Sequence, residues 1–379
     1  MQIKRIVKRI VKKNATLDKY CKKLVLFNMI KRRNDYHSHL PHVLQFPITN
    51  NCNSCCVMCN VTSNHLTEEM TIEEFNRAIN DPLFAELEAV GINGGEPFLC
   101  KNLIPFVEIL AKKDSIKSLN IISNGFLTEI IQEKLREIYK ICRENNKKLH
   151  ISFSLDGVGE IHDKVRGIPG AFSKTMATIR CVRDNLDDYC DSYDVGCTVV
   201  QQNVDYLMEL YVFAQKEMLP IKYRLGIDNE RLYNLSKHNA YSVFADEASR
   251  QTATEFFYFL FGRADHVYDK YKFWAIYTYL SGDEHRRLGC DWQSDDGVTM
   301  DGEGTLYYCA VHSPAIGNIK HGDGKIIFFA EDNRQIRSSI SVKDCDKCIH
   351  DYCGKLNLRN IIEFYKFMLR RRLWVKSYK

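Results

Sequence analysis

The chain has 379 residues, of which 45% are hydrophobic, and a formal net charge of +5. That length can bury a large core, and the sequence has no run of about 18 apolar residues that would predict a membrane-spanning helix. The basic N-terminus lacks the apolar segment and small-residue cleavage site of a secretory signal. Fifteen cysteines therefore indicate metal ligands or reduced thiols in a cytoplasmic protein, not a disulfide scaffold.

Positive charge is concentrated at the two ends of the chain. Residues 1–33 carry +11 and residues 366–379 carry +6, while the 332 residues between them carry −12. This acidic body lacks the basic stripe of a nucleic-acid groove, which disfavours a nucleic-acid partner. Residues 1–13 predict a basic amphipathic helix that lies on an anionic membrane surface, docks on an acidic partner or packs on its own domain.

Short apolar runs alternate with amphipathic segments from residue 43 to about residue 225. The runs predict strands at Val43–Ile48, Ala89–Asn93, Ser118–Ile122, Leu149–Leu155, Val195–Val200 and Ile221–Leu225. The segments between them predict helices such as Thr71–Ala78, Leu103–Lys112, Thr128–Asn145 and Phe172–Asn185. This alternation predicts an α/β fold with a parallel sheet or barrel, whose site forms at the carboxyl ends of the strands.

The pattern divides the chain into five expected segments. A basic helical extension at 1–42 precedes the strand–helix domain at 43–230. An aromatic-rich helical connection follows at 231–288. Residues 289–355 lose the helical period and are rich in cysteine, so we expect a small metal-stabilised domain there. A basic helix at 356–379 closes the chain.

Three cysteines follow the first predicted strand at C-x3-C-x2-C spacing: Cys52, Cys56 and Cys59. Three thiolates on one loop can hold three irons of a four-iron cluster and leave the fourth iron open, as a catalytic cluster requires. Buried thiols or a zinc site are the alternatives, and Cys55 or His65 could supply a fourth zinc ligand. The second strand ends in Gly-Gly-Glu-Pro at 94–97, where glycines allow the backbone to approach a ligand closely.

Four motifs occur in an order that resembles the radical S-adenosylmethionine (radical SAM) enzymes over residues 43–225. They are the cysteine motif, Gly-Gly-Glu-Pro at 94–97, Ser-Asn-Gly at 123–125 and Ser-Leu-Asp-Gly at 154–157. Residues 160–172 resemble the SPASM/Twitch branch of that family. One departure is Met58, where the family usually has an aromatic residue before the third cysteine.

The resemblance implies a partial (β/α)6 TIM-like barrel that uses S-adenosylmethionine and a [4Fe–4S] cluster. It implies that Cys52, Cys56 and Cys59 hold the cluster. It implies that Gly94, Gly95 and Glu96 line the amine of the cofactor, and that Ser123, Asn124, Ser154 and Asp156 lie near its ribose and carboxylate. Arg166 is then expected to pair with the carboxylate. Reductive cleavage of S-adenosylmethionine then gives a 5′-deoxyadenosyl radical that abstracts a substrate hydrogen. Flavodoxin or ferredoxin is the expected electron donor.

Five further cysteines lie within 64 residues near the C-terminus: Cys290, Cys309, Cys345, Cys348 and Cys353. From the spacing alone, they predict either a second iron–sulfur cluster or a zinc ribbon. The resemblance implies the Twitch form with one auxiliary [4Fe–4S] cluster. Its ligands are then Cys290, Cys309, Cys345 and Cys348, with Cys353 as a rival.

Within the family that the chain resembles, an auxiliary cluster beside the substrate suggests a net oxidation, and we expect dehydrogenation of a small molecule such as a sugar or aminocyclitol. A peptide- or protein-modifying maturase is the alternative. Peptide maturases of this family often carry an N-terminal winged-helix module for the leader peptide, and the 42 residues before the first strand are too few for one. Sulfatase-maturing relatives carry an Asp that acts as a base directly after the cysteine that corresponds to Cys309, where this chain has Ala310. Both observations disfavour the maturase alternative. A non-catalytic iron–sulfur or zinc scaffold is the hypothesis from another class. Candidate general bases are Asp291, Asp295 and His312.

Overall fold

The computed structural model describes residues 26, 39–63, 68–293, 296–351 and 354–370. The amphipathic helix predicted at 1–13 lies outside these residues, as do residues 371–379 of the predicted closing helix. No helix within the described ranges is both long enough and apolar enough to cross a bilayer.

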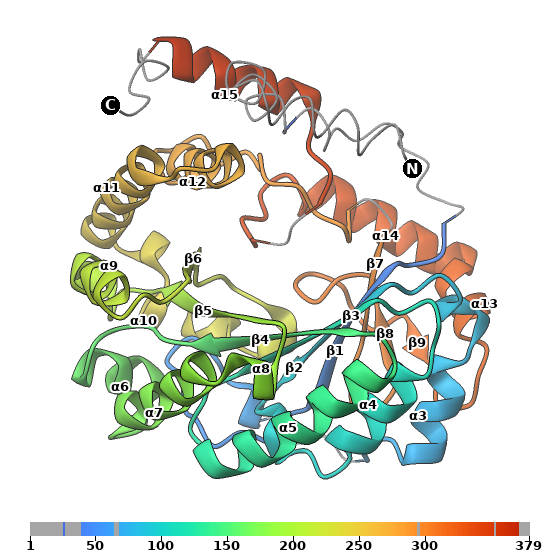
Figure 1. Ribbon diagram of the computed structural model, residues 1–379. Coiled ribbons are helices and arrows are strands. Elements are labelled where there is room, and N and C mark those ends of the chain that lie inside the picture. The colour runs from blue at the N-terminus through green and yellow to red at the C-terminus, as the bar shows by residue number, and fades with distance from the viewer. Residues whose placement is uncertain (1–25, 27–38, 64–67, 294–295, 352–353, 371–379) are drawn as a thin grey trace, which may run out of the picture.

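A nine-stranded sheet forms the centre of the protein (Figure 1). Its first six strands are β1 Val43–Thr49, β2 Ala89–Gly94, β3 Ser118–Ser123, β4 Lys148–Ser154, β5 Ser192–Val199 and β6 Ile221–Leu225. Each pairs in parallel with the next strand along the chain. All six predicted strands are confirmed, with ends that differ by at most three residues. β6 and β9 form opposite edges, so the sheet stays open as expected for a partial barrel.

Helices cover the outer face of this parallel sheet (Figure 1). They are α3 Ile72–Ile79, α4 Leu103–Ala111, α5 Thr128–Glu144, α6 Glu160–Arg166, α7 Ala171–Asp184, α8 Leu186–Tyr189 and α9 Leu207–Lys216. The four predicted helices are confirmed within one residue at each end. Short 3-10 turns are η2 Val61–Ser63, η3 Pro82–Phe84, η4 Pro97–Leu99, η5 Val204–Tyr206, η6 Glu230–Leu232, η7 Leu235–Lys237 and η8 Val243–Ala245.

Aromatic packing fixes the first helices on the outer face of the sheet. Phe46 on β1 stacks on Phe75 of α3 with ring centroids 5.1 Å apart, and Phe75 stacks on Phe106 of α4 at 4.1 Å. Phe46 and Phe75 are fully buried. Because side chains alternate along a strand, the opposite face of the sheet is left to line the interior.

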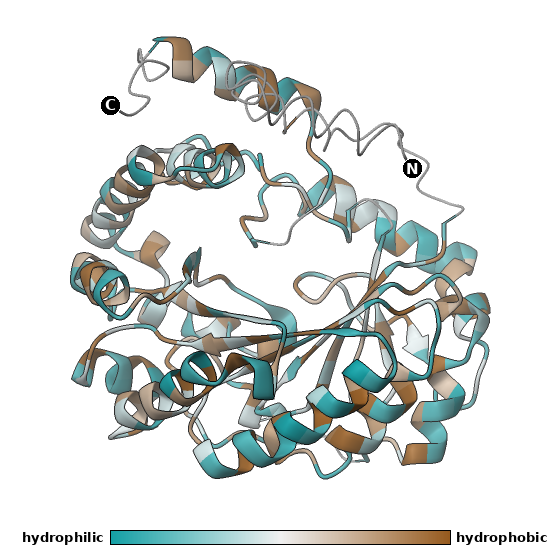
Figure 2. Ribbon diagram, viewed as in Figure 1, coloured by the Kyte–Doolittle hydropathy of each residue, from teal (hydrophilic) through white to brown (hydrophobic). Residues whose placement is uncertain are grey.

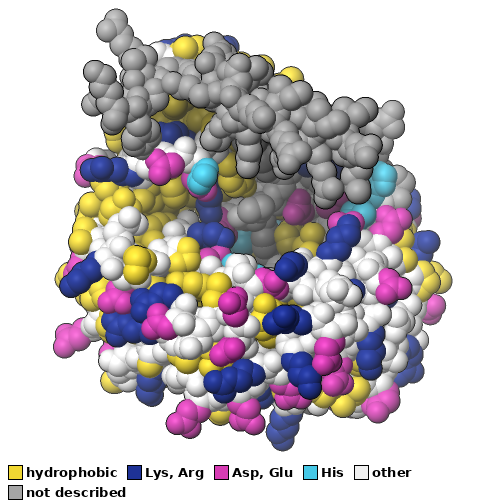
Figure 3. Space-filling view, viewed as in Figure 1, with side chains coloured by type: hydrophobic (Ala, Val, Ile, Leu, Met, Phe, Trp, Pro, Cys, Tyr) yellow, Lys and Arg dark blue, Asp and Glu magenta, His cyan; other side chains and the backbone are white. Residues whose placement is uncertain are grey.

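The predicted helical connection contains α10 His238–Tyr241, α11 Glu247–Arg263 and α12 Val267–Leu280. The closing helix α15 spans Leu358–Arg370 and packs on α12 through Phe364, whose ring lies 5.4 Å from those of Tyr271 and Trp274. Figure 2 shows alternating hydrophobic and hydrophilic bands along α15, as expected for a helix with one packed face. Figure 3 shows this side of the protein hollowed near its centre.

Residues 289–355 contain more regular structure than the sequence predicted. Strand β7 Gly297–Met300 joins the edge of the barrel sheet parallel to β1, and β8 Thr305–Tyr307 and β9 Gly317–Asn318 follow as antiparallel strands. Two helices, α13 Gly324–Phe329 and α14 Glu331–Lys343, lie where no helical period was expected. That expectation was wrong because Ile340 is the only buried side chain of α14, which leaves almost no apolar stripe to detect.

Candidate active site

Three cysteines gather at the carboxyl end of the parallel sheet. Cys52, Cys56 and Cys59 lie on the loop after β1, and all three line one cavity of about 240 Å³. The ends of the next five strands contribute Asn93, Gly94, Gly95, Ser123, Asn124, Ser154, Thr198 and Arg224 to the same wall. The structure thus brings the three predicted cluster ligands together with the glycines, Ser123, Asn124 and Ser154 that the sequence assigned to the cofactor.

Gly94, the last residue of β2, and Gly95, which follows it, pack against the start of the cysteine loop. A Cβ on Gly95 would lie 2.1 Å from the carbonyl oxygen of Asn51, and a Cβ on Gly94 would lie 2.4 Å from that of Thr49. The amide of Gly95 donates to the Thr49 oxygen at 2.6 Å, and the amide of Glu96 donates to the Asn51 oxygen at 2.8 Å. The close approach that requires glycine is therefore made to the backbone of the cysteine loop.

The end of α6 holds the same loop from the other side. The amide of Cys55 donates to the carbonyl oxygen of Arg166 at 3.0 Å, and that of Val57 donates to Val165 at 3.0 Å. Gly167 has a φ of +67°, and a Cβ there would lie 2.4 Å from the Cys55 oxygen. The cysteine loop is thus fixed by backbone contacts with two of the other sequence motifs.

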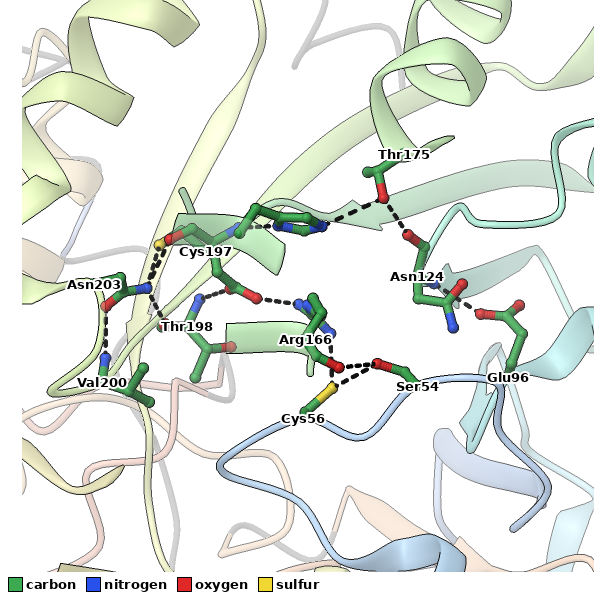
Figure 4. Close-up of polar contacts among 12 residues, drawn as sticks. Ser54, Cys56, Glu96, Asn124, Arg166, Thr175, Cys197, Thr198, Val200 and Asn203 are labelled. Atoms are coloured by element: carbon green, nitrogen blue, oxygen red, sulfur yellow. Dashed lines mark hydrogen bonds and ion pairs between the residues drawn. The ribbon is translucent and has the colours of Figure 1, made fainter. Parts of the chain in front are cut away.

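Glu96 is fully buried and joins the ends of two strands (Figure 4). Its Oε1 accepts hydrogen bonds from Ser123 Oγ at 2.9 Å and from the Phe98 amide at 3.2 Å, and its Oε2 accepts from the Asn124 amide at 2.8 Å. Burial raises the pKa of Glu96 to about 7. Glu96 does not line the cavity, so its predicted contact with the cofactor amine stays a prediction.

Arg166 connects Asp156 to the cysteine loop. Its Nη2 pairs with Asp156 Oδ2 at 2.5 Å, while its Nη1 lies 3.5 Å from Cys56 Sγ (Figure 4). Asp156 is fully buried, and its Oδ1 accepts from the Thr198 amide at 2.7 Å. Of the predicted cofactor contacts, Arg166 therefore reaches the cavity wall, whereas Asp156 lies behind it.

A buried histidine supports this wall from behind. His162 Nδ1 accepts from the Asp156 amide at 3.0 Å, and Nε2 lies 3.4 Å from Thr175 Oγ1. Thr175 Oγ1 in turn donates to the Asn124 carbonyl at 2.9 Å (Figure 4). Burial, together with the charge of Arg166, lowers the pKa of His162 well below its usual range, so the neutral ring donates from Nε2.

Sequence reasoning missed three charged or ionisable residues of the cavity: Arg224, His350 and Asp351. Arg224 is a cation near the carboxyl end of strand β6, and this position in a parallel sheet could have marked it as a site residue. His350 and Asp351 lie between Cys348 and Cys353, and they were overlooked because this segment was considered only as a source of cysteine ligands. The Asp351 carboxylate lies 3.3 Å from Lys272 Nζ, and burial lowers the pKa of His350 to about 4.

The groups in this cavity fit an iron–sulfur cluster and S-adenosylmethionine. Burial raises the pKa of Cys52 to about 12, so thiolates there need the positive charge that iron supplies. Arg166 Nε and Asn93 Oδ1 are buried without a hydrogen-bond partner among the described residues, and both residues line the cavity. They offer one donor and one acceptor to the carboxylate and amine of the cofactor.

A second cavity, of about 220 Å³, is lined by four of the C-terminal cysteines: Cys290, Cys309, Cys345 and Cys348. These are the four predicted auxiliary ligands, and Cys353 lies outside the described residues. No three His, Cys, Asp or Glu side chains of the described chain converge as ligands of a single metal ion.

A buried arginine connects two segments next to this cavity, residues 288–289 and residues 348–350. Arg286 Nη1 donates to the carbonyl oxygens of Cys348 at 2.7 Å and His350 at 2.9 Å, while Nη2 donates to Gly289 at 2.9 Å and Nε to Leu288 at 3.0 Å. Arg286 is 6% exposed and lines the cavity. All four acceptors are neutral, so a negatively charged cluster in the cavity would balance the guanidinium.

The two candidate bases that the structure describes, Asp291 and His312, do not line the first cavity. His312 lines the auxiliary cavity, and its pKa is raised by a hydrogen bond to Cys348. Burial, followed by the charge of Asp296, raises the pKa of Asp291 to about 6, but Asp291 lines neither cavity. Asp295 lies outside the described residues.

Comparison with known proteins identifies the domain. Residues 46–211 match the Radical SAM superfamily. The chain is 29% identical over 180 residues to the antilisterial bacteriocin subtilosin biosynthesis protein AlbA of Bacillus subtilis, covering 47% of this chain and 37% of AlbA. It is 28% identical over 194 residues to an AdoMet-dependent heme synthase of Methanosarcina barkeri, covering 50% of this chain and 51% of that protein. The chain therefore spans about half or less of these curated relatives.

The fold is similar to that of solved structures at low identity. Streptococcus suis SuiB bound to precursor peptide SuiA superposes with a TM-score of 0.55 at 14% identity, covering 86% of this chain and 71% of SuiB. The predicted cofactors S-adenosylmethionine and a [4Fe–4S] cluster are confirmed at the level of the superfamily. Residues 46–211 form a radical SAM domain, and the relatives found support the predicted resemblance to the SPASM/Twitch branch of the radical SAM enzymes.

Proposed function

We propose that this chain cleaves S-adenosylmethionine reductively at a [4Fe–4S] cluster held by Cys52, Cys56 and Cys59. The observation that carries the proposal is the cavity in which these three thiols face the ends of β2 to β6. Bound there, the cluster would supply the electron that splits the carbon–sulfur bond and yields a 5′-deoxyadenosyl radical able to abstract a substrate hydrogen.

The protein's own groups bind and orient the cofactor. The cavity-lining members of the predicted set are Gly94, Gly95, Ser123, Asn124, Ser154 and Arg166. Arg166 Nε would donate to the cofactor carboxylate, and Asn93 Oδ1 would accept from its amine. Glu96 and Asp156 act from behind the wall, because their carboxylates hold the strand ends and Arg166 in place.

The auxiliary site in residues 289–355 belongs to the same proposal. Cys290, Cys309, Cys345 and Cys348 are its ligands, supported by their shared cavity and by the adjacent charge of Arg286. His350 supports a functional connection, since its side chain lines the first cavity and its carbonyl accepts from Arg286 in the wall of the second. A flavodoxin or ferredoxin donor and an anionic surface at the basic ends stay predictions.

A peptide is the substrate class that the relatives favour, which reverses the order of the sequence-based hypotheses. AlbA is named for bacteriocin biosynthesis, and the SuiB structure holds a precursor peptide. Sugar dehydrogenation, the first hypothesis from sequence, has no comparable support among these relatives. The heme synthase relative shows that the domain also serves other substrates, so the reaction on the peptide is left at hydrogen abstraction.

The test is anaerobic reconstitution with iron and sulfide, followed by incubation with S-adenosylmethionine and dithionite. We expect about eight irons in the wild type and about four in a Cys52/Cys56/Cys59→Ala variant. Only the wild type should form 5′-deoxyadenosine. Cys348→Ala should lose about four irons and Cys353→Ala should retain all of them. Stoichiometric zinc, or no nucleoside from fully loaded protein, would return the scaffold hypothesis to first place.

A second experiment separates the substrate classes. The reconstituted enzyme is incubated with precursor-like peptides and, separately, with sugars and aminocyclitols, and both 5′-deoxyadenosine and substrate mass are followed. Peptides should raise nucleoside formation above the rate without substrate and should change in mass. A mass loss of about two hydrogens from an aminocyclitol alone would restore the dehydrogenase hypothesis.

A further inference from the structure

Strand β6 carries two cations on one face: Lys222 pairs with Asp194, whereas Arg224 lines the cavity. Arg224 pairs in register with Thr198 of β5, and both line the cavity that holds the three-cysteine loop. Its neighbours Tyr223 and Leu225 are 2% and 6% exposed and belong to the hydrophobic core. Because successive side chains on a strand alternate, Arg224 points to the opposite face, into the cavity.

Gly196 provides the space that the Arg224 guanidinium occupies. A Cβ on Gly196 would lie 2.6 Å from Arg224 Nη2 and 3.6 Å from its Cζ. A glycine inside a strand weakens that strand and often marks the close approach of another group. Here that group is the guanidinium, which lies directly over β5 and is thereby held in a defined position.

The other charges of the cavity are paired within the protein. Arg166 pairs with Asp156 at 2.5 Å, and Asp351 pairs with Lys272 at 3.3 Å. Arg224 forms neither a hydrogen bond nor an ion pair within 4.0 Å with any residue that the structure describes; Asp351, His350 and Cys197 are its charged and titratable neighbours. A guanidinium presents a rigid fork of donors that matches a carboxylate with two parallel hydrogen bonds.

We infer that Arg224 binds a carboxylate of the substrate, which makes an acidic residue or a C-terminus of the peptide the recognised group. This inference rests on the proposed function. S-adenosylmethionine is the other source of a carboxylate in this cavity, but its predicted contacts lie at the ends of β2 to β4 and on Arg166. Arg224 lies on β6, the edge strand, beside His350 and Asp351 from the C-terminal segment.

The test uses the reconstituted enzyme saturated with S-adenosylmethionine and two small probes, N-acetyl-glutamate methylamide and its neutral glutamine isostere. Ligand-detected NMR gives the dissociation constants. The wild type should bind the glutamate probe about 10-fold or more tightly than the glutamine probe, as expected for a charge-assisted bidentate pair. Arg224→Gln should abolish this preference, and Arg224→Lys should retain part of it.

Two further variants make the result specific. Gly196→Ala should also reduce the preference, because its Cβ displaces the guanidinium while Arg224 itself is retained. If Arg224→Gln does not retain its iron, the probe preference of Gly196→Ala tests the inference instead. Arg180→Gln is the matched control: Arg180 is an exposed arginine paired with Glu217 at 2.9 Å and does not line the cavity, so the preference should persist.

Three outcomes would overturn the inference. The first is equal binding of both probes to the wild type. The second is tighter binding of inorganic phosphate than of the glutamate probe at Arg224. The third is a weaker affinity for S-adenosylmethionine in Arg224→Gln with probe binding unchanged, which would assign Arg224 to the cofactor. Formation of 5′-deoxyadenosine by the wild type is measured separately, so failure of the proposed function is distinguished from failure of this inference.

Discussion

Arg166 reaches the cysteine loop with its Nη1, which lies 3.5 Å from the Sγ of Cys56. The same guanidinium pairs with Asp156, which is fully buried, and the Arg166 carbonyl accepts from Ser54 Oγ at 3.0 Å. The residue that ends α6 thus ties the proposed cluster loop to the end of β4. Because the ion pair lies inside the protein, its two charges depend on each other.

Removing one member of the Arg166–Asp156 ion pair should lower the free energy of unfolding more than removing both. We expect Arg166→Met to lower the free energy of unfolding by about 3–5 kcal/mol, because it leaves the Asp156 carboxylate buried without its cation. The double variant Asp156→Asn/Arg166→Met should be more stable than Arg166→Met alone. Denaturant unfolding under anaerobic conditions measures both. A double variant as unstable as the sum of the two single changes would show that the residues are not coupled.

Glu96 should make stability depend on pH in a defined direction. Its pKa is raised to about 7 by burial, above its usual 4.5, so between these values the folded protein binds more protons than the unfolded chain. Stability from this group is therefore fully present below pH 4.5 and is lost as the pH rises toward 7. Relative to Glu96→Gln, the wild type should become less stable across that interval.

The measurement is the unfolding free energy of wild type and Glu96→Gln at several pH values from 4.5 to 8. Taking the difference between the two proteins removes the contribution of all other titrating groups. A difference that stays constant over this range, or that favours the wild type as the pH rises, would contradict the raised pKa.

The strands and the three-cysteine loop could be predicted because both are recognised from the residue pattern of short segments. The apolar runs marked all six barrel strands, and parallel strands bring their carboxyl ends together, so Cys52 and Ser123 could be assigned to one site without coordinates. The same argument failed for α14, whose exposed surface carries little apolar pattern. Hydrophobic periodicity arises from a buried helix face, so a helix that is mostly exposed shows little of it in the sequence.

Contacts between distant segments were not predictable. Arg166 was expected to meet the cofactor carboxylate, but its pairing with Asp156 depends on how α6 sits over β4. The need for Gly95 was attributed to a ligand, whereas the structure assigns it to the backbone of Asn51. Arg224 was missed because its meaning comes from Gly196 on the neighbouring strand, which only the register of β5 and β6 reveals.

Gly95 should be required for iron at the three-cysteine site. In Gly95→Ala the new Cβ would lie 2.1 Å from the Asn51 oxygen, so the start of the cysteine loop must move. We expect a loss of about four irons and of 5′-deoxyadenosine formation, together with about 1–3 kcal/mol of stability from overpacking. Iron analysis and denaturant unfolding measure these effects.

Gly91→Ala is the matched control, in β2 four residues before Gly95. A Cβ at Gly91 meets only the Leu44 oxygen at 3.9 Å, an ordinary contact. This variant should keep about eight irons. Equal iron loss in both variants would mean that β2 does not tolerate alanine in general, and full iron in Gly95→Ala would show that the cysteine loop adapts without cost to its ligands.

Arg286 should govern the second cluster through both structure and charge. Its guanidinium connects the backbone of residues 288–289 with that of Cys348 and His350, and it is the buried cation of a cavity lined by four cysteines. Arg286→Met should therefore lower the iron content of this site. In protein that retains the cluster, the midpoint potential should become more negative, because removal of a nearby positive charge disfavours the added electron.

Arg286→Lys separates the two effects, since an ammonium keeps the charge but cannot span four carbonyl oxygens from one position. It should lose iron as Arg286→Met does, yet show a smaller shift in potential where the cluster is retained. Arg250→Met is the control, because Arg250 also donates to a carbonyl, that of Leu280 at 2.8 Å, but does not line the cavity. Redox titration followed by electron paramagnetic resonance gives the potentials. If Arg286→Met and Arg250→Met behave alike, the charge of Arg286 does not act on the cluster, and its hydrogen bonds serve only to fold the segment.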